Sequence, residues 1–300
     1  MTEPAPLPLP VPLALARALP LPSTLTPSKI SAFTSCALAF RYSVVEQLPE
    51  LPSLPAFRGT LVHRALQHFL TYTDAGSRDR AAAQASLLSS FELMRDDSEL
   101  EALALDEAAR AKLLAEATVL LDHYFELEDP NEVCPAGLEL DMRVEIDGLT
   151  LRGIIDRLDV LPDGSFAVVD YKTGRAPRAE QAKSRLSGVQ LYALLCEEIL
   201  GRRPSVVRLL YLRDRVVVSA EPTDQTMRGV RQRARGVWQA IERACSRGDF
   251  RPNPSALCSW CAYQSLCPAF GGAVPDIAAS ELVEAAGRRA IAGGVRALVS

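Results

Sequence analysis

The spacing of hydrophobic positions changes near residue 138, and the change predicts helices before that point and strands after it. Apolar residues recur at helical spacing from Pro27 onward, where Thr26 can cap a first helix. They recur again over 57–73, where Leu61 and Phe69 belong to one apolar stripe. Residues 79–126 are rich in Ala, Leu and Glu, which predicts two or three further helices.

Three antiparallel strands are predicted next, at about 138–146, 149–161 and 166–172. Asp147-Gly148 and the run Pro162-Asp163-Gly164 separate them as hairpin turns. The remaining predicted elements are a helix at about 186–200 ending at Gly201, a hairpin over 206–222 and a helix at about 223–247. The order predicts an α/β (α+β) fold in which helices flank a central sheet.

The register of the second predicted hairpin decides which polar side chains meet. Pairing residue 161 with 166 would put Asp156 opposite Tyr171 and leave Asp170 and Lys172 on the other face. Pairing 161 with 167 puts Asp156 opposite Lys172, so that Asp156, Asp170 and Lys172 share a face. Both aspartates end apolar runs, Gly153-Ile154-Ile155 and Ala167-Val168-Val169, which favours partial burial. We expect the second register, or an equivalent bulge at the turn.

Composition narrows the class of protein without assigning a function. The chain has 300 residues, is 48% hydrophobic and carries a net charge of −4, so any nucleic-acid surface must be local. Residues 1–23 are rich in Pro and Leu, and the prolines exclude both a signal-peptide helix and a membrane span. We expect a disordered lead-in over 1–23, an Ala-rich and helical tail over 273–300, and a cytoplasmic protein without membrane contact.

Three cysteines form a C-x2-C-x5-C array at Cys258, Cys261 and Cys267. The chain has seven cysteines, an odd number at low density, and the tight spacing favours metal binding over disulfides. A closed structural site takes four ligands, so this array requires a fourth from elsewhere.

The aspartates and the lysine of the second hairpin suit metal-assisted hydrolysis. Two carboxylates on a sheet can hold Mg²⁺ through oxygen ligands, and a neighbouring lysine can position water or balance phosphate charge. The alternative is that these residues form a solvent-exposed strand face with a cross-strand ion pair. Most isolated D-x-K sequences lie in that kind of structure.

Five motifs in order carry a family resemblance: RGTLVHRAL, LRGIIDRLD, VVDYKTG, QLYALL and the cysteine array. Over about residues 25–272 the chain resembles the RecB-family exonucleases of the PD-(D/E)XK nuclease superfamily. It is most similar to their iron–sulfur branch, which includes the AddB nuclease domain and the CRISPR-adaptation nucleases. The resemblance implies a restriction-endonuclease-like core with a mixed central sheet, forming one domain over 24–272 that an iron–sulfur cluster closes.

The resemblance also implies roles for individual residues. The implied ligands of a catalytic Mg²⁺ or Mn²⁺ are His63, Asp156, Asp170 and the backbone carbonyl of Tyr171. The implied catalytic residues are Asp156, Asp170, Lys172 and Tyr192. The implied ligands of a [4Fe–4S] cluster are Cys36, Cys258, Cys261 and Cys267. The family has a glutamine four residues before this tyrosine, and the corresponding residue here is Gly188. Either Gln190 takes the role of that glutamine, or the site lacks it.

The resulting hypothesis is a metal-dependent DNA exonuclease acting on single strands or unwound ends in repair or recombination. The sequence contains no helicase P-loop, so an unwinding partner would be another chain. Arg228, Arg231 and Arg235 share one helix face that could contact DNA phosphates, or could simply be solvated. The alternatives are a non-cleaving module that binds DNA or a partner protein, a CRISPR-adaptation nuclease, and a zinc protein using the same four cysteines.

Overall fold

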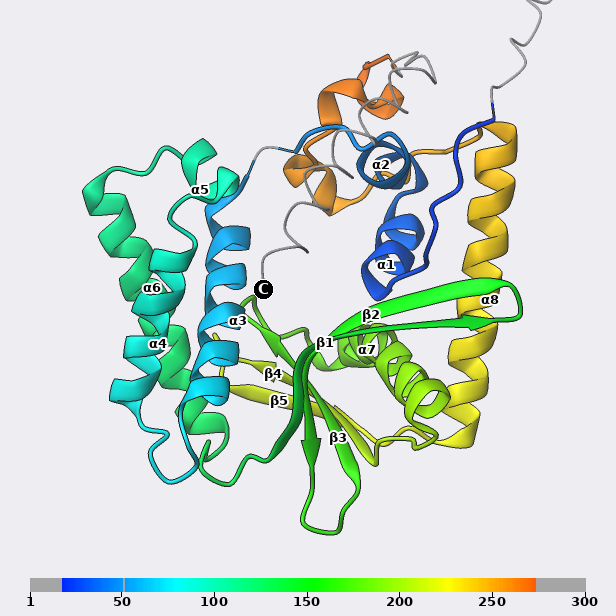
Figure 1. Ribbon diagram of the computed structural model, residues 1–300. Coiled ribbons are helices and arrows are strands. Elements are labelled where there is room, and N and C mark those ends of the chain that lie inside the picture. The colour runs from blue at the N-terminus through cyan, green and yellow to red at the C-terminus, as the bar shows by residue number, and fades with distance from the viewer. Residues whose placement is uncertain (1–17, 51, 274–300) are drawn as a thin grey trace, which may run out of the picture. The chain divides into compact units, whose positions relative to one another are not determined.

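The computed structural model describes residues 18–50 and 52–273 (Figure 1). These residues belong to two compact units. The sheet unit contains residues 23–34 and 49–237, and the cysteine unit contains 18–22, 35–48 and 238–273. Most of the predicted lead-in, up to residue 17, and the predicted helical tail from residue 274 lie outside the described residues.

The elements follow the predicted order. The helices before the sheet are α1 (Pro27–Ser35), α2 (Ala37–Phe40), the π-helical turn η1 (Arg41–Val45), α3 (Leu54–Tyr72), α4 (Arg80–Leu93), α5 (Ser98–Ala102) and α6 (Glu107–Leu127). The sheet and its partners are β1 (Pro135–Ile146), β2 (Leu149–Val160), β3 (Phe166–Lys172), α7 (Ala179–Leu200), β4 (Val206–Tyr211), β5 (Val216–Ala220) and α8 (Asp224–Arg247). The predicted strands are confirmed to within three residues, whereas α7 begins seven residues before its predicted start.

The five strands form one mixed sheet in the order β1-β2-β3-β4-β5. Only β3 and β4 are parallel, and α7 is the helix of the connection between them. Asp147 and Gly148 both adopt positive φ, of 53° and 76°, which gives the tight turn predicted between β1 and β2. The prediction of a central mixed sheet flanked by helices is therefore confirmed.

The register between β2 and β3 differs from the predicted one. Val160 pairs with Phe166 and Arg157 with Val169, where the paired ladder ends. Continued by one residue, this alignment would place Asp156 opposite Asp170 rather than opposite Lys172. The cause is a shorter loop, in which the Leu161 N–H bonds the Ser165 carbonyl at 2.8 Å and Gly164 takes a φ of 78°. Because the shift is two residues, it preserves which side chains share a face.

The helices α3, α4 and α6 form a layer with an apolar interior. The predicted stripe on α3 is buried completely, as Leu61, Leu66 and Phe69 are 0% exposed. It packs into one cluster with residues of α4 and α6 and with Val169 and Tyr171 of β3. α3 is capped by the Ser53 hydroxyl, which accepts a hydrogen bond from the Ala56 N–H. This packing fixes α3 beside the end of β3.

α7 packs against β1, β2 and β4, as Figure 1 shows. It ends as predicted at Gly201, whose φ of 65° is left-handed. A Cβ atom on Gly153 of β2 would lie 2.7 Å from the Tyr192 ring, so glycine permits the close approach of α7 to β2. Within the described part of the chain, no helix is both long and apolar enough to cross a membrane.

The cysteine unit contains little regular structure. Besides α2, η1 and the end of α8, it has three short 3-10 helices, η2 (Ala256–Trp260), η3 (Gln264–Leu266) and η4 (Pro268–Phe270). None of these three buries a residue. Tyr42 and Tyr263 are buried and lie in a tilted contact at 5.4 Å between ring centroids, beside other buried residues of the unit such as Leu38 and Phe40.

Candidate metal centre

The middle of β2 and the end of β3 bring together three predicted site residues. Asp156 lies on β2, and Asp170 and Lys172 lie on β3. Both carboxylates are buried, with 9% and 3% of their residue surface exposed. Lys172 Nζ lies 2.5 Å from Asp170 Oδ2 and forms an ion pair with it.

α3 supplies the predicted histidine to the same place. His63 Nε2 lies 3.0 Å from the Tyr171 carbonyl oxygen, and His63 Nδ1 lies 3.5 Å from Asp156 Oδ2. The Tyr171 N–H donates to Asp156 Oδ2 at 2.7 Å. The backbone of Tyr171 therefore contacts both His63 and Asp156. The structure thus gathers every residue that the resemblance implied as a ligand of the catalytic metal.

Glu139 of β1 also belongs to this site, although the sequence analysis did not identify it. Potential ligand atoms of His63, Glu139 and Asp156 all lie within 4.8 Å of one another. The pairs Leu138–Arg157 and Leu140–Ile155 place Glu139 opposite Asp156, and Glu139 adopts a left-handed φ of 48°. Such backbone strain in a non-glycine residue concentrates at functional sites. The only indication of this role in the sequence was a carboxylate near the start of the predicted strand that precedes the GIID segment.

The pKa values in the site show that it concentrates negative charge. Burial raises the pKa of the Asp170 carboxyl to about 6, opposed by the Lys172 ammonium and reinforced by Asp156. Burial also raises the pKa of Glu139, and the neighbouring Asp156 adds to this shift. Burial alone would lower the pKa of His63, but Asp156, Asp170 and Glu139 outweigh it and raise that pKa. Three carboxylates facing one ammonium can be neutralised by a divalent cation.

The donor set fits Mg²⁺ or Mn²⁺. Both ions prefer oxygen ligands, and imidazole can complete the set. In an octahedral site with metal–ligand distances of about 2.1 Å, adjacent ligands lie about 3 Å apart. His63 Nε2 and the Tyr171 carbonyl oxygen lie 3.0 Å apart as a hydrogen-bonded pair, in which the imidazole N–H donates. Once that nitrogen gives up its proton, both atoms can face one cation. A metal could therefore be held by His63, Asp156, Asp170 and the Tyr171 carbonyl, with Glu139 as a further ligand.

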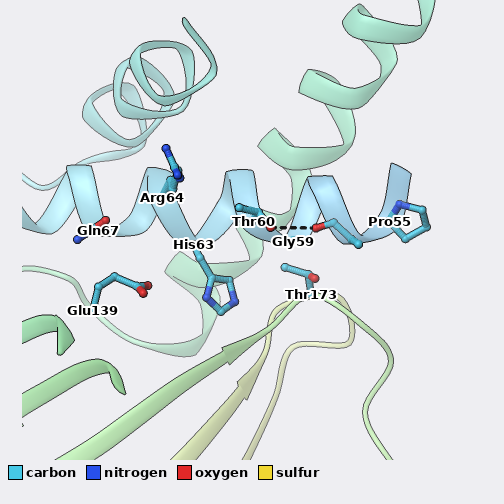
Figure 2. A pocket seen from close by; sticks show the side chains of 9 residues that line it. Pro55, Gly59, Thr60, His63, Arg64, Gln67, Glu139 and Thr173 are labelled. Carbon is cyan, nitrogen blue, oxygen red and sulfur yellow. Dashed lines mark hydrogen bonds between the residues drawn. The ribbon is translucent and has the colours of Figure 1, made fainter. Parts of the chain in front are cut away.

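A groove of about 590 Å³ lies along α3, and His63 and Glu139 of the candidate metal centre are among its lining residues. In Figure 2, His63 points from α3 toward the end of the strand, with Glu139 and Thr173 near it. The lining residues are Pro55, Ala56, Gly59, Thr60, His63, Arg64, Gln67, Glu139 and Thr173. A Cβ atom on Gly59 would lie 3.1 Å from Thr173 Oγ1, so the glycine lets α3 lie close to the end of β3.

Of the QLYALL motif on α7, only one residue lies near the carboxylates of the candidate metal centre. Burial raises the pKa of Tyr192, and the carboxylates of Asp170, Asp156 and Glu139 raise it further, which places the phenol near them. Gln190, among the described residues, makes no hydrogen bond to these side chains. A Cβ atom on Gly188 would meet no atom within 4 Å, so lack of space does not explain the missing glutamine.

The arginine face predicted on α8 is largely paired with carboxylates. Arg231 lies 2.5 Å from Glu198 Oε1 and 3.0 Å from Glu197 Oε1, both on α7. Arg235 pairs with Asp147 of the β1–β2 turn. Arg228 is exposed. These pairs stabilise helix packing and leave less free positive charge on this face than the sequence suggests.

The four predicted cluster cysteines all lie in the cysteine unit, and none is in a disulfide. Cys36 Sγ accepts a hydrogen bond from the Asn253 N–H at 3.4 Å, and Cys258 Sγ accepts one from the Ser255 N–H at 3.2 Å. Cys36 and Cys267 both act electrostatically on the Tyr42 phenol, so Cys36 lies in the neighbourhood of the C-terminal array. Within the described ranges no three of these sulfur atoms lie within 4.8 Å of one another.

Comparisons with known proteins bear on the family and the fold of this chain. The chain is 30% identical over 140 residues to the Gene 69 protein of Mycobacterium phage L5, a match that covers 44% of each chain. The chain thus spans less than half the length of that relative. A crystal structure of a candidate exonuclease from Eubacterium rectale matches with a TM-score of 0.52 at 10% identity, covering 80% of this chain and 88% of that chain. This likeness shows the fold alone.

The family itself is shown by a match over most of the chain. The sequence pattern of the PD-(D/E)XK nuclease superfamily matches residues 24–268, a range that includes the metal centre and all four predicted cluster cysteines. The mixed sheet flanked by helices is the fold of that superfamily. The chain belongs to the PD-(D/E)XK nuclease superfamily.

Proposed function

We propose that this protein is a Mg²⁺- or Mn²⁺-dependent deoxyribonuclease that removes nucleotides from the ends of single-stranded or unwound DNA. The observation that carries the proposal is the convergence of His63, Asp156 and Asp170 beside Lys172. A buried group of carboxylates with an imidazole and an ammonium suits phosphodiester hydrolysis better than it suits a structural ion pair.

Each residue has a separate task in this proposal. A bound divalent cation would polarise a phosphoryl oxygen and lower the pKa of a water molecule. Asp156 and Asp170 supply negative charge that holds the cation, and the Tyr171 N–H fixes the orientation of Asp156. Lys172, whose side chain is 43% exposed, presents a positive charge to the phosphate as negative charge develops on it.

The groove along α3 gives the substrate strand a path away from the metal centre. Arg64 is exposed and Gln67 is half-buried, so both can donate hydrogen bonds to phosphate oxygens. Arg64 has no ion-pair partner among the described residues, although its charge lowers the pKa of the nearby Glu139. Contacts to phosphates without contacts to bases would bind a strand regardless of its sequence.

We further propose that Cys36, Cys258, Cys261 and Cys267 hold a [4Fe–4S] cluster, as in the iron–sulfur branch of the RecB-family exonucleases. The hydrogen bonds from backbone N–H groups to Cys36 Sγ and Cys258 Sγ support this, since such bonds stabilise thiolate ligands. Visible absorption and stoichiometric iron in anaerobically purified protein would support the cluster. A colourless protein with stoichiometric zinc would show a zinc site instead.

DNA repair or recombination in the cytoplasm is the role that we propose, together with a separate helicase or recombination partner that supplies unwound ends. Free cysteines are consistent with a reducing compartment. A role in CRISPR adaptation would use the same chemistry on a different substrate. The absence of a glutamine at Gly188 is the one observation that favours a non-cleaving DNA-binding module.

Linear and circular single strands distinguish these possibilities in one experiment. The protein is incubated with Mn²⁺ or Mg²⁺ and with linear strands labelled at the 5′ or 3′ end, beside an unlabelled circular strand. The proposal predicts degradation of linear strands only, and the label released first gives the polarity. Cutting of the circle would show an endonuclease. Binding without cutting, in protein that contains its full complement of iron, would show a non-cleaving module.

A further inference from the structure

One arginine of the sheet unit is completely buried beside the metal centre. Arg157 follows Asp156 on β2, and its side chain is 0% exposed. Its guanidinium binds Glu128, just after α6, in a bidentate manner, with Nη2 donating to Oε2 at 2.8 Å. Its Nε donates to Asp159 at 3.0 Å. A buried charge is stable only when its donors are satisfied, so this side chain has one permitted position.

The same guanidinium fixes the ring of Tyr171. Arg157 Nη1 donates to the Tyr171 phenol oxygen at 2.6 Å and lies 3.3 Å from the Tyr124 phenol oxygen. The Tyr171 ring is also in edge contact with the rings of Tyr124, at 5.9 Å, and His63, at 6.0 Å. Tyr171 is therefore held at its phenol by Arg157 and along its ring by two aromatic neighbours.

The backbone of Tyr171 makes the two contacts that organise the metal ligands. Its N–H donates to Asp156 Oδ2 at 2.7 Å, and its carbonyl oxygen lies 3.0 Å from His63 Nε2. A shift of this one residue would move both atoms together. The buried pair of Glu128 and Arg157 is thus linked to the metal ligands through a single side chain.

We propose that Tyr171 is a positioning residue, whose phenol is anchored by the Glu128–Arg157 pair so that its backbone holds His63 and Asp156 at the spacing of one metal ion. The inference deepens the proposed function and rests on the metal centre described there. Partners that orient metal ligands typically contribute about 10- to 100-fold to metal affinity or activity.

The test compares two tyrosine-to-phenylalanine variants of the full chain. Tyr171→Phe removes the phenol oxygen that Arg157 holds at 2.6 Å and keeps the ring. Tyr124→Phe removes a phenol oxygen from the same guanidinium, at 3.3 Å, but Tyr124 makes no hydrogen bond or ring contact with His63 or Asp156 among the described residues. Mn²⁺ affinity is measured by calorimetry or by electron paramagnetic resonance, without DNA. Thermal unfolding without metal is measured on the same samples.

Tyr171→Phe is expected to weaken Mn²⁺ binding about tenfold or more. Tyr124→Phe is expected to change Mn²⁺ binding less than threefold, although both variants lose a comparable amount of thermal stability. Glu128→Gln, which weakens the anchor without removing a ring, is expected to fall between them. Wild-type Mn²⁺ affinity in Tyr171→Phe would overturn the inference, as would equal losses in both tyrosine variants. Failure of the wild type to bind Mn²⁺ would also overturn it. A wild type that binds Mn²⁺ but cuts no DNA would overturn the nuclease proposal alone.

Discussion

The metal centre of the sheet unit and the cysteine array differ in what holds their ligands. Asp156 and Asp170 lie on paired strands, are buried, and are fixed by regular backbone and by Tyr171. In the array, Cys258 lies on the 3-10 helix η2, and Cys261 and Cys267 lie directly after η2 and η3, helices that bury no residue. The first site is organised by the fold before any metal binds. The second has little packing of its own, so metal binding there would supply folding energy.

This difference predicts that substitutions in the two regions have separable effects. A change in the sheet unit should alter catalysis and metal affinity without affecting iron content. A change in the cysteine array should alter iron content and stability without changing the intrinsic Mn²⁺ affinity of the sheet unit. Each of the following variants tests one side of this separation.

Lys172→Met is expected to give the largest effect on rate. The variant loses the positive charge beside Asp170, so kcat should fall roughly 10²–10³-fold. Mn²⁺ affinity should stay the same or rise, because a competing cation leaves Asp170 Oδ2. The measurement is steady-state cleavage over a range of Mn²⁺ concentrations, with Lys112→Met on α6 as the control. Weaker Mn²⁺ binding in Lys172→Met would show that the lysine holds the metal ligands in place, instead of stabilising negative charge on the phosphate.

Cys36→Ser is expected to give the largest effect on stability. Loss of one ligand should remove the visible absorption and most of the iron. The first unfolding transition should fall by roughly 10 °C or more, since metal binding would contribute several kcal/mol of folding energy. Cys134→Ser is the matched control, because Cys134 is an exposed cysteine outside the array. A Cys36→Ser protein that retains both its iron and its transition temperature would exclude Cys36 as the fourth ligand.

Glu139→Gln tests whether the ligand that the sequence analysis missed belongs to the site. The amide keeps the shape of the side chain and removes one negative charge, so the Mn²⁺ concentration for half-maximal activity should rise roughly tenfold. Glu145→Gln, on an exposed position of the same strand, serves as the control. Equal metal requirements for the two variants would mean that Glu139 lies near the metal without binding it.

Arg64→Gln is expected to give the smallest effect, confined to substrate binding. KM for a single strand should rise a few-fold with kcat unchanged, and the salt dependence of binding should lose about 0.7 in slope, as for one phosphate contact. Arg110→Gln, an exposed arginine on α6, is the control. An unchanged salt dependence in Arg64→Gln would show that Arg64 contacts no phosphate and that the substrate strand does not lie in the α3 groove.

The sequence predicted the strands and the convergence of Asp156, Asp170 and Lys172, because alternating apolar residues and Asp-Gly turns determine faces. It did not predict the exact register, since Pro162, Asp163 and Gly164 are compatible with loops of several lengths. Strand analysis assumes that successive side chains point to alternate faces of the sheet. Glu139 was missed because its left-handed backbone interrupts that alternation. Arg157 was missed because an arginine in a strand is usually exposed, and only the folded protein shows its partners.

The central claim is that the buried carboxylates of Asp156 on β2 and Asp170 on β3 support metal-dependent cleavage. The most direct test measures degradation of an end-labelled single strand over a Mn²⁺ titration by wild type and by Asp170→Asn, both with full iron content. We predict saturable, Mn²⁺-dependent degradation by wild type and a loss of at least about 10³-fold in the variant. Equal degradation by the two proteins, or none by wild type at any Mn²⁺ concentration, would contradict the claim.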